Sequence, residues 1–300
     1  MCGVIVRSQS GFFHVQTGTG VVVCQLRGRL KQGRRTGDIA AVGDRVQISQ
    51  QGDGTGMIEN VEPRQRMFAR RDPTPQGEYV QVILANPDQV VLIFACTEPR
   101  PHFGMIDRFL VICEKQAVPP LLVANKVDRL GLSQAEELFS RYSRLGYPLV
   151  YTSARLGTGV AELQQRLVGR LSLFTGPSGV GKSSLLNAIQ PGLGLSTREI
   201  SQATSKGRHT TVVRQLFPLE GGGFVADTPG LKALALWDIE PEEVDGYLPE
   251  LSALVGACAF SDCTHVHEPG CAVRAAVEAG EIHPSRYQSY LSMRFGMEES

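Results

Sequence analysis

Several features are missing from this 300-residue sequence, and their absence excludes whole classes of protein. No apolar run approaches the roughly eighteen residues of a membrane-spanning helix, and residues 1–10 lack the basic and apolar segments of a secretory signal. There is no internal repeat and no low-complexity segment. With 42% hydrophobic and 20% charged residues, the composition is that of ordinary globular domains. We therefore expect a cytoplasmic protein of two or three domains with no membrane partner.

Cysteine is sparse, and the odd number of seven argues against a disulfide framework. Four cysteines in apolar surroundings are predicted to be core residues: Cys2, Cys24, Cys96 and Cys113. The other three lie in CAFSDCTHVHEPGC, at 258–271. This segment has the pattern C-x4-C-x-H-x5-C, whose four ligands suit a closed structural zinc site: Cys258, Cys263, His265 and Cys271. His267 is a rival ligand.

The net charge is zero because 30 basic residues balance 30 acidic ones, but the two signs are unevenly distributed along the chain. Basic residues number 11 against 6 acidic ones in residues 1–73, 16 against 12 in 74–235, and 3 against 12 in 236–300. The chain therefore has a basic front and an acidic tail.

The basic front shows about five short apolar or alternating runs between glycine-rich turns, which predicts a small β-barrel. Its basic residues gather in two groups: Arg27, Arg29, Lys31, Arg34 and Arg35, then Arg64, Arg66, Arg70 and Arg71. They are either solvated loop charges or phosphate contacts to nucleic acid, and a small barrel with a basic loop favours the second. Residues 70–79, with two prolines, are predicted to be a linker.

After the linker, apolar strands alternate with helical patterns, which predicts an α/β domain with a mainly parallel sheet covered on both faces. The strands are expected at 90–97, 119–125, 147–153, 170–176 and 222–228. Acidic helical stretches follow from about residue 236 and flank the cysteine-rich turn.

Residues 176–184, GPSGVGKSS, follow a predicted strand, open a predicted helix and match the phosphate-binding pattern G-x-x-x-x-G-K-[ST]. The glycines let backbone N–H groups surround a β-phosphate, Lys182 neutralises the β- and γ-phosphates, and Ser183 ligates Mg²⁺. The expected nucleotide-binding residues of this loop are Gly176, Pro177, Ser178, Gly179, Val180, Gly181, Lys182, Ser183 and Ser184.

NKVD at 125–128 identifies the base, because the Asp128 carboxylate can accept hydrogen bonds from the two donors that guanine has and adenine lacks. Asn125 would bridge neighbouring loops, and the aliphatic stem of Lys126 would cover the base. The next strand ends in Ser153 and Ala154, whose backbone N–H would meet the guanine oxygen.

DTPG at 227–230 follows another apolar strand, so that Asp227 can hold Mg²⁺ and the Gly230 N–H can sense the γ-phosphate. The preceding GRHTT segment would supply the remaining magnesium ligand, Thr211, with Thr210 left open. The expected magnesium ligands are thus Ser183, Thr211 and Asp227.

Together, NKVD, TSA, GPSGVGKSS, GRHTT and DTPG are similar to the motif set of P-loop GTPases in circularly permuted order. Nearly the whole chain resembles the RsgA family of ribosome small subunit-dependent GTPases. The resemblance implies an all-β OB-fold RNA-binding domain at 1–72, a permuted α/β GTPase domain at 80–235 and a mainly helical zinc-binding domain at 236–300. It also favours His265 over His267 as the zinc ligand. We expect a monomer that hydrolyses GTP, contacts the 30S subunit and 16S rRNA, and acts late in small-subunit maturation.

Hydrolysis needs a group that orients water, and Leu231, which follows DTPG, cannot hydrogen-bond. Intrinsic turnover should therefore be slow, and His209 or the ribosome must supply the missing group; Lys182 and His209 are the catalytic candidates. The alternatives are a GTP-regulated rRNA-binding protein and a large-subunit assembly GTPase with incidental hydrolysis. A small-molecule kinase is disfavoured because it would not need the guanine-binding motifs NKVD and TSA. We also hypothesise that the junction after Gly230 transmits the nucleotide state to the tail.

Overall fold

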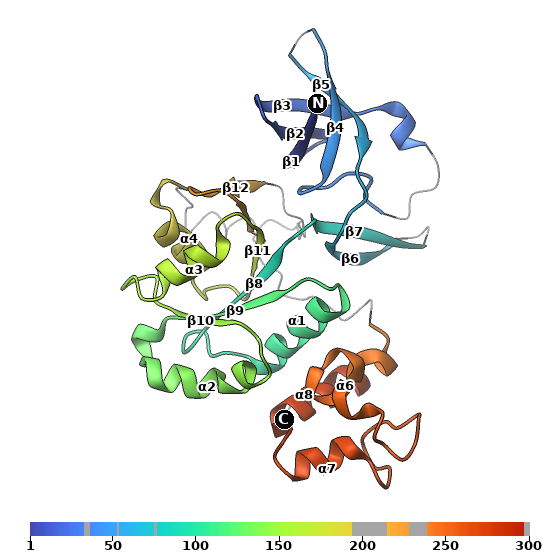
Figure 1. Cartoon of the computed structure of the whole chain (residues 1–300), viewed down its shortest axis with the longest axis vertical. Helices are drawn as coiled ribbons and strands as arrows, with labels where there is room; N and C mark the ends of the chain where they lie inside the picture. Colours follow the sequence, from blue (N-terminus) through green and yellow to red (C-terminus); the bar gives the residue numbers. More distant parts are fainter. Residues whose placement is uncertain (33–36, 53, 75–76, 194–214, 228–238, 297–300) are drawn as a thin grey trace.

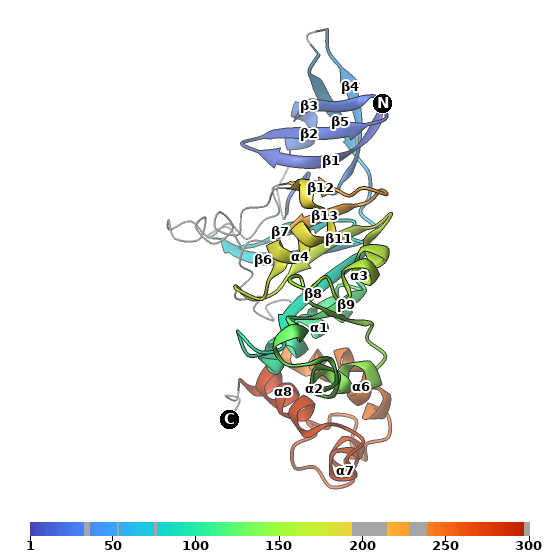
Figure 2. The ribbon, with the colours of Figure 1, turned by 90° about the vertical axis from the view of Figure 1, so that its left-hand side faces the viewer.

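The computed structural model describes residues 1–32, 37–52, 54–74, 77–193, 215–227 and 239–296. Three units follow one another along the long axis of the molecule: a β-barrel at the N-terminus, a central sheet with helices, and a helical tail (Figures 1 and 2). No helix in these ranges is both long and apolar enough to span a bilayer.

The N-terminal unit is a closed five-stranded barrel in the order β1-β2-β3-β5-β4. Hydrophobic and polar residues alternate along its strands, so that inward residues such as Ile5, Val15 and Cys24 are buried while their neighbours lie nearer the surface. Closing the sheet into a barrel buries this apolar face. Closure removes exposed strand edges and confirms the barrel predicted from the sequence. The strands are β1 (Cys2–Gln9), β2 (Phe12–Thr17), β3 (Gly20–Leu26), β4 (Arg45–Gln50) and β5 (Gly56–Val61), and a short helix η1 (Gly28–Lys31) follows β3. The core prediction is wrong for Cys2, which is exposed.

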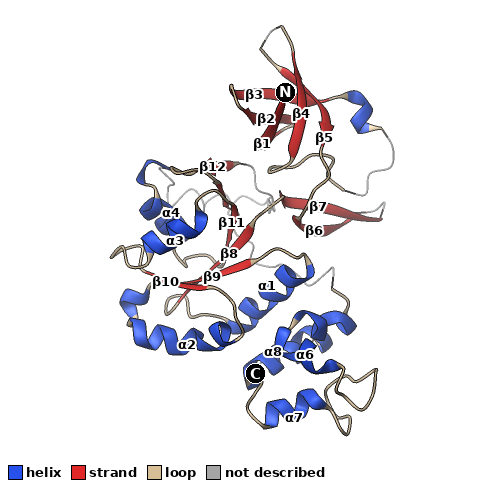
Figure 3. Ribbon diagram, viewed as in Figure 1, coloured by secondary structure: helices blue, strands red, loops and turns tan. Residues whose placement is uncertain are grey.

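The predicted linker at 70–79 is instead part of an antiparallel hairpin, β6 (Met67–Thr74) with β7 (Gly77–Ala85) (Figure 3). Both strands are buried at their β6–β7 pairing: Phe68 packs in the large core with its partner Leu84, and Val82 packs in a small cluster with Ala41 and Ala85. Pro73 lies next to the turn, where a missing ladder donor costs little. The polar, proline-containing sequence therefore belongs to the tip of a hairpin.

The central sheet has six strands in the order β10-β9-β8-β11-β13-β12 (Figure 3). All neighbouring pairs are parallel except β12 with β13, which confirms the mainly parallel sheet. The three-residue edge strand β12 was not predicted, because it is too short to show a period. The strands are β8 (Gln89–Ala95), β9 (Pro120–Asn125), β10 (Leu149–Thr152), β11 (Leu171–Thr175), β12 (Leu216–Pro218) and β13 (Phe224–Asp227).

Both faces of this sheet are covered because successive residues of its strands are apolar and buried, so that each strand has an apolar side chain on either side. Val90, Leu92 and Phe94 of β8 pack in the core that includes α1 (Phe103–Lys115) and α2 (Leu132–Arg144). The intervening residues of β8 pack with α3 (Val160–Leu167) and α4 (Lys182–Ile189). Short helices η2 (Val127–Arg129) and η3 (Pro191–Leu193) follow β9 and α4.

The tail consists of η4 (Pro241–Tyr247), α6 (Pro249–Val255), α7 (Ala272–Glu278) and α8 (Pro284–Phe295). Helix α8 docks on α1 through Arg286, whose side chain is 1% exposed. Arg286 Nη1 lies 2.7 Å from Asp107 Oδ1 of α1, and Arg286 Nε lies 2.5 Å from Glu250 Oε1 of α6. The Asp107 carboxylate also accepts from Tyr142 and Ser289. This buried ionic network holds the tail against the central unit.

Replacing Arg286 by methionine should lower the free energy of unfolding by about 3–5 kcal/mol, because Asp107 and Glu250 would stay buried without their cation. Urea denaturation measures the change. Arg274→Met on α7 is the matched control, since Arg274 is partly exposed and its loss should cost less than about 0.5 kcal/mol. Equal effects of the two substitutions would show that the network does not hold the tail.

Candidate nucleotide and metal sites

The motifs identified in the sequence meet at the carboxyl edge of the central sheet. In the strand register, Ala95 of β8 and Thr152 of β10 are both partners of Asn125 on β9, while Phe174 of β11 is the partner of Asp227 on β13. Because these strands are parallel, the loops that follow them emerge on one side. The order of the motifs along the chain therefore does not prevent them from forming one site.

The loop from Gly176 to Gly181 joins β11 to α4 and requires glycine at both ends. Gly176 has φ 143°, and a Cβ there would lie 2.1 Å from the Ile93 carbonyl oxygen. Gly181 has φ 99°, and a Cβ there would lie 2.5 Å from Asn125 Nδ2. Both positions combine a positive φ with close neighbours, so any side chain would distort the loop.

Lys182, the first residue of α4, is buried and turned back onto the loop. Its Nζ donates to the carbonyl oxygens of Gly176 at 2.8 Å and Pro177 at 2.9 Å. Burial lowers the pKa of Lys182, and the nearby Asp227 opposes this shift. A phosphate oxygen would offer this buried cation a charged acceptor, which is stronger than a neutral carbonyl.

Asp227 ends β13 and is 9% exposed, and its Oδ1 has no hydrogen-bond partner in the described part of the chain. Burial raises the pKa of Asp227 to about 6, although Lys182 acts in the opposite direction. A buried carboxylate oxygen without a partner is the kind of ligand that Mg²⁺ requires. Asp227 and Ser183 therefore fit a magnesium ion that accompanies a nucleotide.

The Asp227 pKa predicts a pH dependence for binding of a magnesium nucleotide. A pKa raised above its ordinary value of 3.8 favours the neutral acid, which stabilises the nucleotide-free fold at low pH and ceases to do so above about pH 6. Magnesium binding needs the carboxylate, so affinity should fall about tenfold per unit below pH 6. Titrations of a non-hydrolysable GTP analogue between pH 5 and 8 measure this. In Asp227→Asn this loss of affinity below pH 6 should disappear. A pH profile identical to that of the wild-type protein would exclude Asp227 as the titrating group.

The NKVD residues surround the space beside this phosphate loop. Asn125 Nδ2 donates to the Val180 carbonyl at 2.8 Å and its Oδ1 accepts from Thr152 Oγ1 at 3.0 Å, so Asn125 joins three loops. Lys126, at φ 67°, donates to the carbonyl of Gly179 at 2.7 Å. These contacts fix the relative positions of the base-reading and phosphate-binding loops.

Asp128 is held as a carboxylate by its neighbours. Ser153 Oγ donates to Asp128 Oδ1 at 2.6 Å and lowers the pKa of Asp128, and Arg155 Nε lies 3.2 Å from Oδ2. Ser153 thus positions the acceptor, while the following Ala154 N–H has no acceptor in the described ranges. Asp128 and Ala154 together offer an acceptor and a donor to one base edge.

The tail brings together Cys258, Cys263, His265 and Cys271, whose ligand atoms lie within 4.8 Å of one another. Cys258 Sγ and Cys271 Sγ are 4.0 Å apart, and His265 Nδ1 lies 3.6 and 3.4 Å from them. A tetrahedral zinc ion with bonds of about 2.3 Å needs edges of about 3.8 Å, so the geometry fits. The exposed His267 lies outside this group.

Three residues hold His265 and its loop in place. Asp245 Oδ2 lies 3.1 Å from His265 Nε2, which leaves Nδ1 to face the sulfurs. Tyr287 OH donates to the His265 carbonyl at 2.6 Å. The Glu268 carboxylate accepts from the N–H groups of residues 264, 266 and 267, and these bonds, with the Thr264 hydroxyl, hold its pKa well below the usual range. Asp245 could not be identified from the motif, since it lies 20 residues before the histidine.

Two of the arginines in the basic clusters are held by acidic partners within the protein. Arg27 Nη1 lies 2.5 Å from Glu59 Oε1, and the hydrogen bond to Glu59 raises the pKa of Arg27. Arg64 Nε lies 2.8 Å from the fully buried Asp44 and has a structural role. The clustered basic residues are therefore not all available to a ligand. His209, Thr210, Thr211, Gly230 and Leu231 lie outside the described residues, as do Arg34 and Arg35.

Comparisons with known proteins agree over most of the chain. Residues 61–237 match the family model of the RsgA GTPase, and residues 2–58 match that of the RsgA N-terminal domain. The chain is 45% identical over 296 residues to the small ribosomal subunit biogenesis GTPase RsgA of Gemmatimonas aurantiaca, covering 97% of this chain and 96% of the relative. It is 44% identical over 292 residues to the protein of the same name from Moorella thermoacetica, with the same coverage.

Solved structures give the same result. The structure of YjeQ from Thermotoga maritima matches with a TM-score of 0.79 and 40% identity, covering 98% of this chain and 97% of that one. YloQ, described as a circularly permuted GTPase, matches with a TM-score of 0.73 and 28% identity over 100% of this chain and 96% of that one. The matches cover the barrel, the permuted central unit and the tail. This chain therefore belongs to the RsgA family and is a circularly permuted GTPase that hydrolyses GTP.

Proposed function

We propose that the protein binds the 30S ribosomal subunit and hydrolyses GTP to GDP and phosphate there, as a late maturation factor in the cytoplasm. The observation that carries this proposal is the meeting of Asp128 and Ser153 with Lys182 and Asp227 at one edge of the sheet. The first two suit guanine and the second two suit a magnesium triphosphate. The printed names of the curated relatives, small ribosomal subunit biogenesis GTPases, support the ribosomal part.

In this proposal, residues of the chain bind and orient GTP. Asp128 accepts from the guanine donors, Asn125 keeps the two loops in register, and the loop backbone from Gly176 to Ser184 surrounds the phosphates. Lys182 stabilises the negative charge that moves toward the leaving phosphate. Mg²⁺ held by Asp227 and Ser183, with Thr211 as the further candidate, would supply charge neutralisation. His209 remains the candidate for orienting water, and Gly230 for sensing the γ-phosphate.

The tail is proposed to hold one structural zinc ion through three cysteines and His265. Four protein ligands leave no position open for a substrate, so the ion would stabilise the fold. The barrel is proposed to contact 16S rRNA through basic residues, with the protein acting as a monomer.

GTP turnover by the purified protein with 30S subunits, with 50S subunits and alone tests the proposal. We expect stimulation by 30S of on the order of 10²-fold or more, because a group supplied in trans contributes 10³–10⁵-fold in other GTPases. Equal stimulation by 50S would favour large-subunit assembly. Binding to 30S without stimulation would favour a GTP-regulated rRNA-binding protein.

A further inference from the structure

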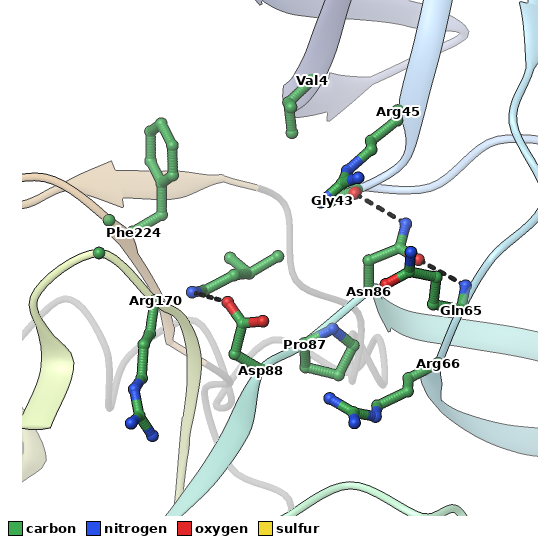
Figure 4. A pocket seen from close by; sticks show the side chains of 13 residues that line it. Val4, Gly43, Arg45, Gln65, Arg66, Asn86, Pro87, Asp88, Arg170 and Phe224 are labelled. Atoms are coloured by element: carbon green, nitrogen blue, oxygen red, sulfur yellow. Dashed lines mark hydrogen bonds between the residues drawn. The ribbon is translucent and has the colours of Figure 1, made fainter.

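A pocket of about 230 Å³ lies between the barrel and the amino edge of the central sheet, away from the motif loops (Figure 4). The barrel supplies Val4 and Arg45, and the segment after β5 supplies Arg66. Arg170 precedes β11, and Phe224 begins β13. The proposed nucleotide and zinc sites use none of these residues, so the pocket is a separate feature of the molecule.

The pocket carries an excess of positive charge. Arg45 and Arg66 are exposed, and neither guanidinium has a hydrogen bond or an ion pair within the described chain. Arg170 contributes less, because its side chain is directed away from the opening and its Nη1 lies 3.3 Å from Gln89 Oε1, outside the pocket lining (Figure 4). The one acidic lining residue is Asp88, whose Oδ2 already accepts from the Leu171 N–H at 2.7 Å. Two arginines, Arg45 and Arg66, against one aspartate leave a net charge of +1 at the opening.

An apolar wall lies beside the arginines. Val4, Pro87, Leu171 and Phe224 line the same pocket, and Figure 4 shows Val4 and Phe224 across the opening from Arg66. The volume is below the roughly 300–1,000 Å³ of sites for drug-sized ligands, and it suits a phosphate with part of its nucleoside. Arginine forks match phosphate oxygens, and an aromatic ring accepts a base or sugar face.

The backbone that carries the arginines is fixed to the sheet by Asn86, at φ 51°. Its Nδ2 donates to the Gly43 carbonyl at 3.2 Å and its Oδ1 accepts from the Gln65 N–H at 2.9 Å (Figure 4). Its N–H donates to the Arg66 carbonyl at 2.9 Å. Barrel, connecting segment and sheet are therefore tied at one residue. The pocket does not have to assemble before a ligand binds, which lowers the cost of binding.

We propose that this pocket binds a nucleotide phosphate, either in the backbone of a single-stranded RNA or in a free nucleotide. The site is separate from the guanine site. The inference rests on the proposed RNA contact of the barrel and assigns that contact a pocket with Arg45 and Arg66. In an RNA complex, the phosphodiester would lie between Arg45 and Arg66 and one nucleoside would lie against Phe224.

The test compares Arg45→Gln/Arg66→Gln with the control Arg144→Gln/Arg166→Gln, which removes the same charge from α2 and α3. The probe is a fluorescent oligouridylate of about ten nucleotides, within the usual site size of such barrels. We expect about a tenfold or greater loss of affinity in the pocket variant. The slope of log K against log salt should fall by about 1.4, or about 0.7 for each arginine, and the control should change neither value.

A second variant, Asp88→Asn, keeps an acceptor for the Leu171 N–H and removes the only acidic charge of the pocket. It should raise oligouridylate affinity several-fold. Uridine 5′-monophosphate and inorganic phosphate, added as competitors, distinguish a free nucleotide from single-stranded RNA as the ligand of the pocket. Displacement at micromolar concentration assigns the pocket to a free nucleotide, and no displacement at millimolar concentration assigns it to RNA.

Equal losses in the pocket and control variants, or no gain in Asp88→Asn, would overturn the proposal. Thermal unfolding of each variant checks that the protein is folded. GTPase stimulation by 30S is measured in parallel with wild-type protein. If 30S still stimulates the GTPase but the pocket substitutions do not change oligouridylate affinity, only this inference fails. If 30S does not stimulate the GTPase but the pocket substitutions weaken oligouridylate binding, only the proposed function fails.

Discussion

Lys182→Met should reduce the rate constant of GTP hydrolysis by on the order of 10³-fold. Lys182 is the buried cation of the phosphate loop, and its ammonium already lies against the carbonyls of Gly176 and Pro177. Methionine is an unbranched apolar residue only one atom shorter, so it fills most of the same space and removes the ammonium group with its charge and hydrogen bonds. The loss should appear mainly in the chemical step, because negative charge moves toward the leaving phosphate in the transition state.

Single-turnover measurements with enzyme in excess separate this effect from nucleotide binding. Lys31→Met, on the exposed helix η1 of the barrel, is the matched control and should leave the intrinsic rate unchanged. A reduction of less than tenfold in Lys182→Met would show that the loop lysine does not stabilise the reacting phosphate.

The second large effect is expected at the base. Asp128→Asn should weaken GTP binding by on the order of 10²–10⁴-fold, because two hydrogen bonds to a charged acceptor contribute about 1.5–3 kcal/mol each. The asparagine NH₂ would also face guanine donors. Ser153 can still donate to the remaining oxygen at this position, so the loop should keep its shape.

Xanthosine triphosphate makes this prediction specific, because its base has a carbonyl where guanine has an amino group. Asp128→Asn should bind it more tightly than GTP, whereas the wild-type protein should show the opposite preference. The exposed Glu162→Gln removes the same charge on α3 and should leave both affinities unchanged. Equal affinity of Asp128→Asn and wild-type protein for GTP would exclude Asp128 as the base-reading residue.

Much of the architecture could be predicted because the apolar residues follow regular patterns within each segment. The continuous apolar runs of β8, β9 and β11 mark buried strands, and alternating runs between glycine-rich turns mark the barrel strands. The expected nucleotide residues that the structure describes lie at strand ends, where parallel pairing brings them together. Local sequence carries this information because backbone geometry fixes where each strand ends.

Predictions failed where the local sequence was ambiguous. The hairpin β6 and β7 contains proline and polar residues near its turn, so its sequence resembles a linker. Cys2 lies beside apolar residues in β1 but faces solvent, because alternation places neighbours on opposite sides. In each case the buried face is set by a partner strand, which the segment itself does not specify.

The sequence alone determined the chemistry of this protein: a guanine-reading loop before a phosphate loop, and a C-x4-C-x-H-x5-C metal pattern in the tail. These depend on residue type and short spacing. Only the tertiary structure decided how the tail is held, since Arg286 and Asp107 are 179 residues apart. It alone also decided that Arg64 is structural while Arg45 and Arg66 face a pocket. The physical reason is that burial and ion pairing depend on segments that meet only after the chain has folded.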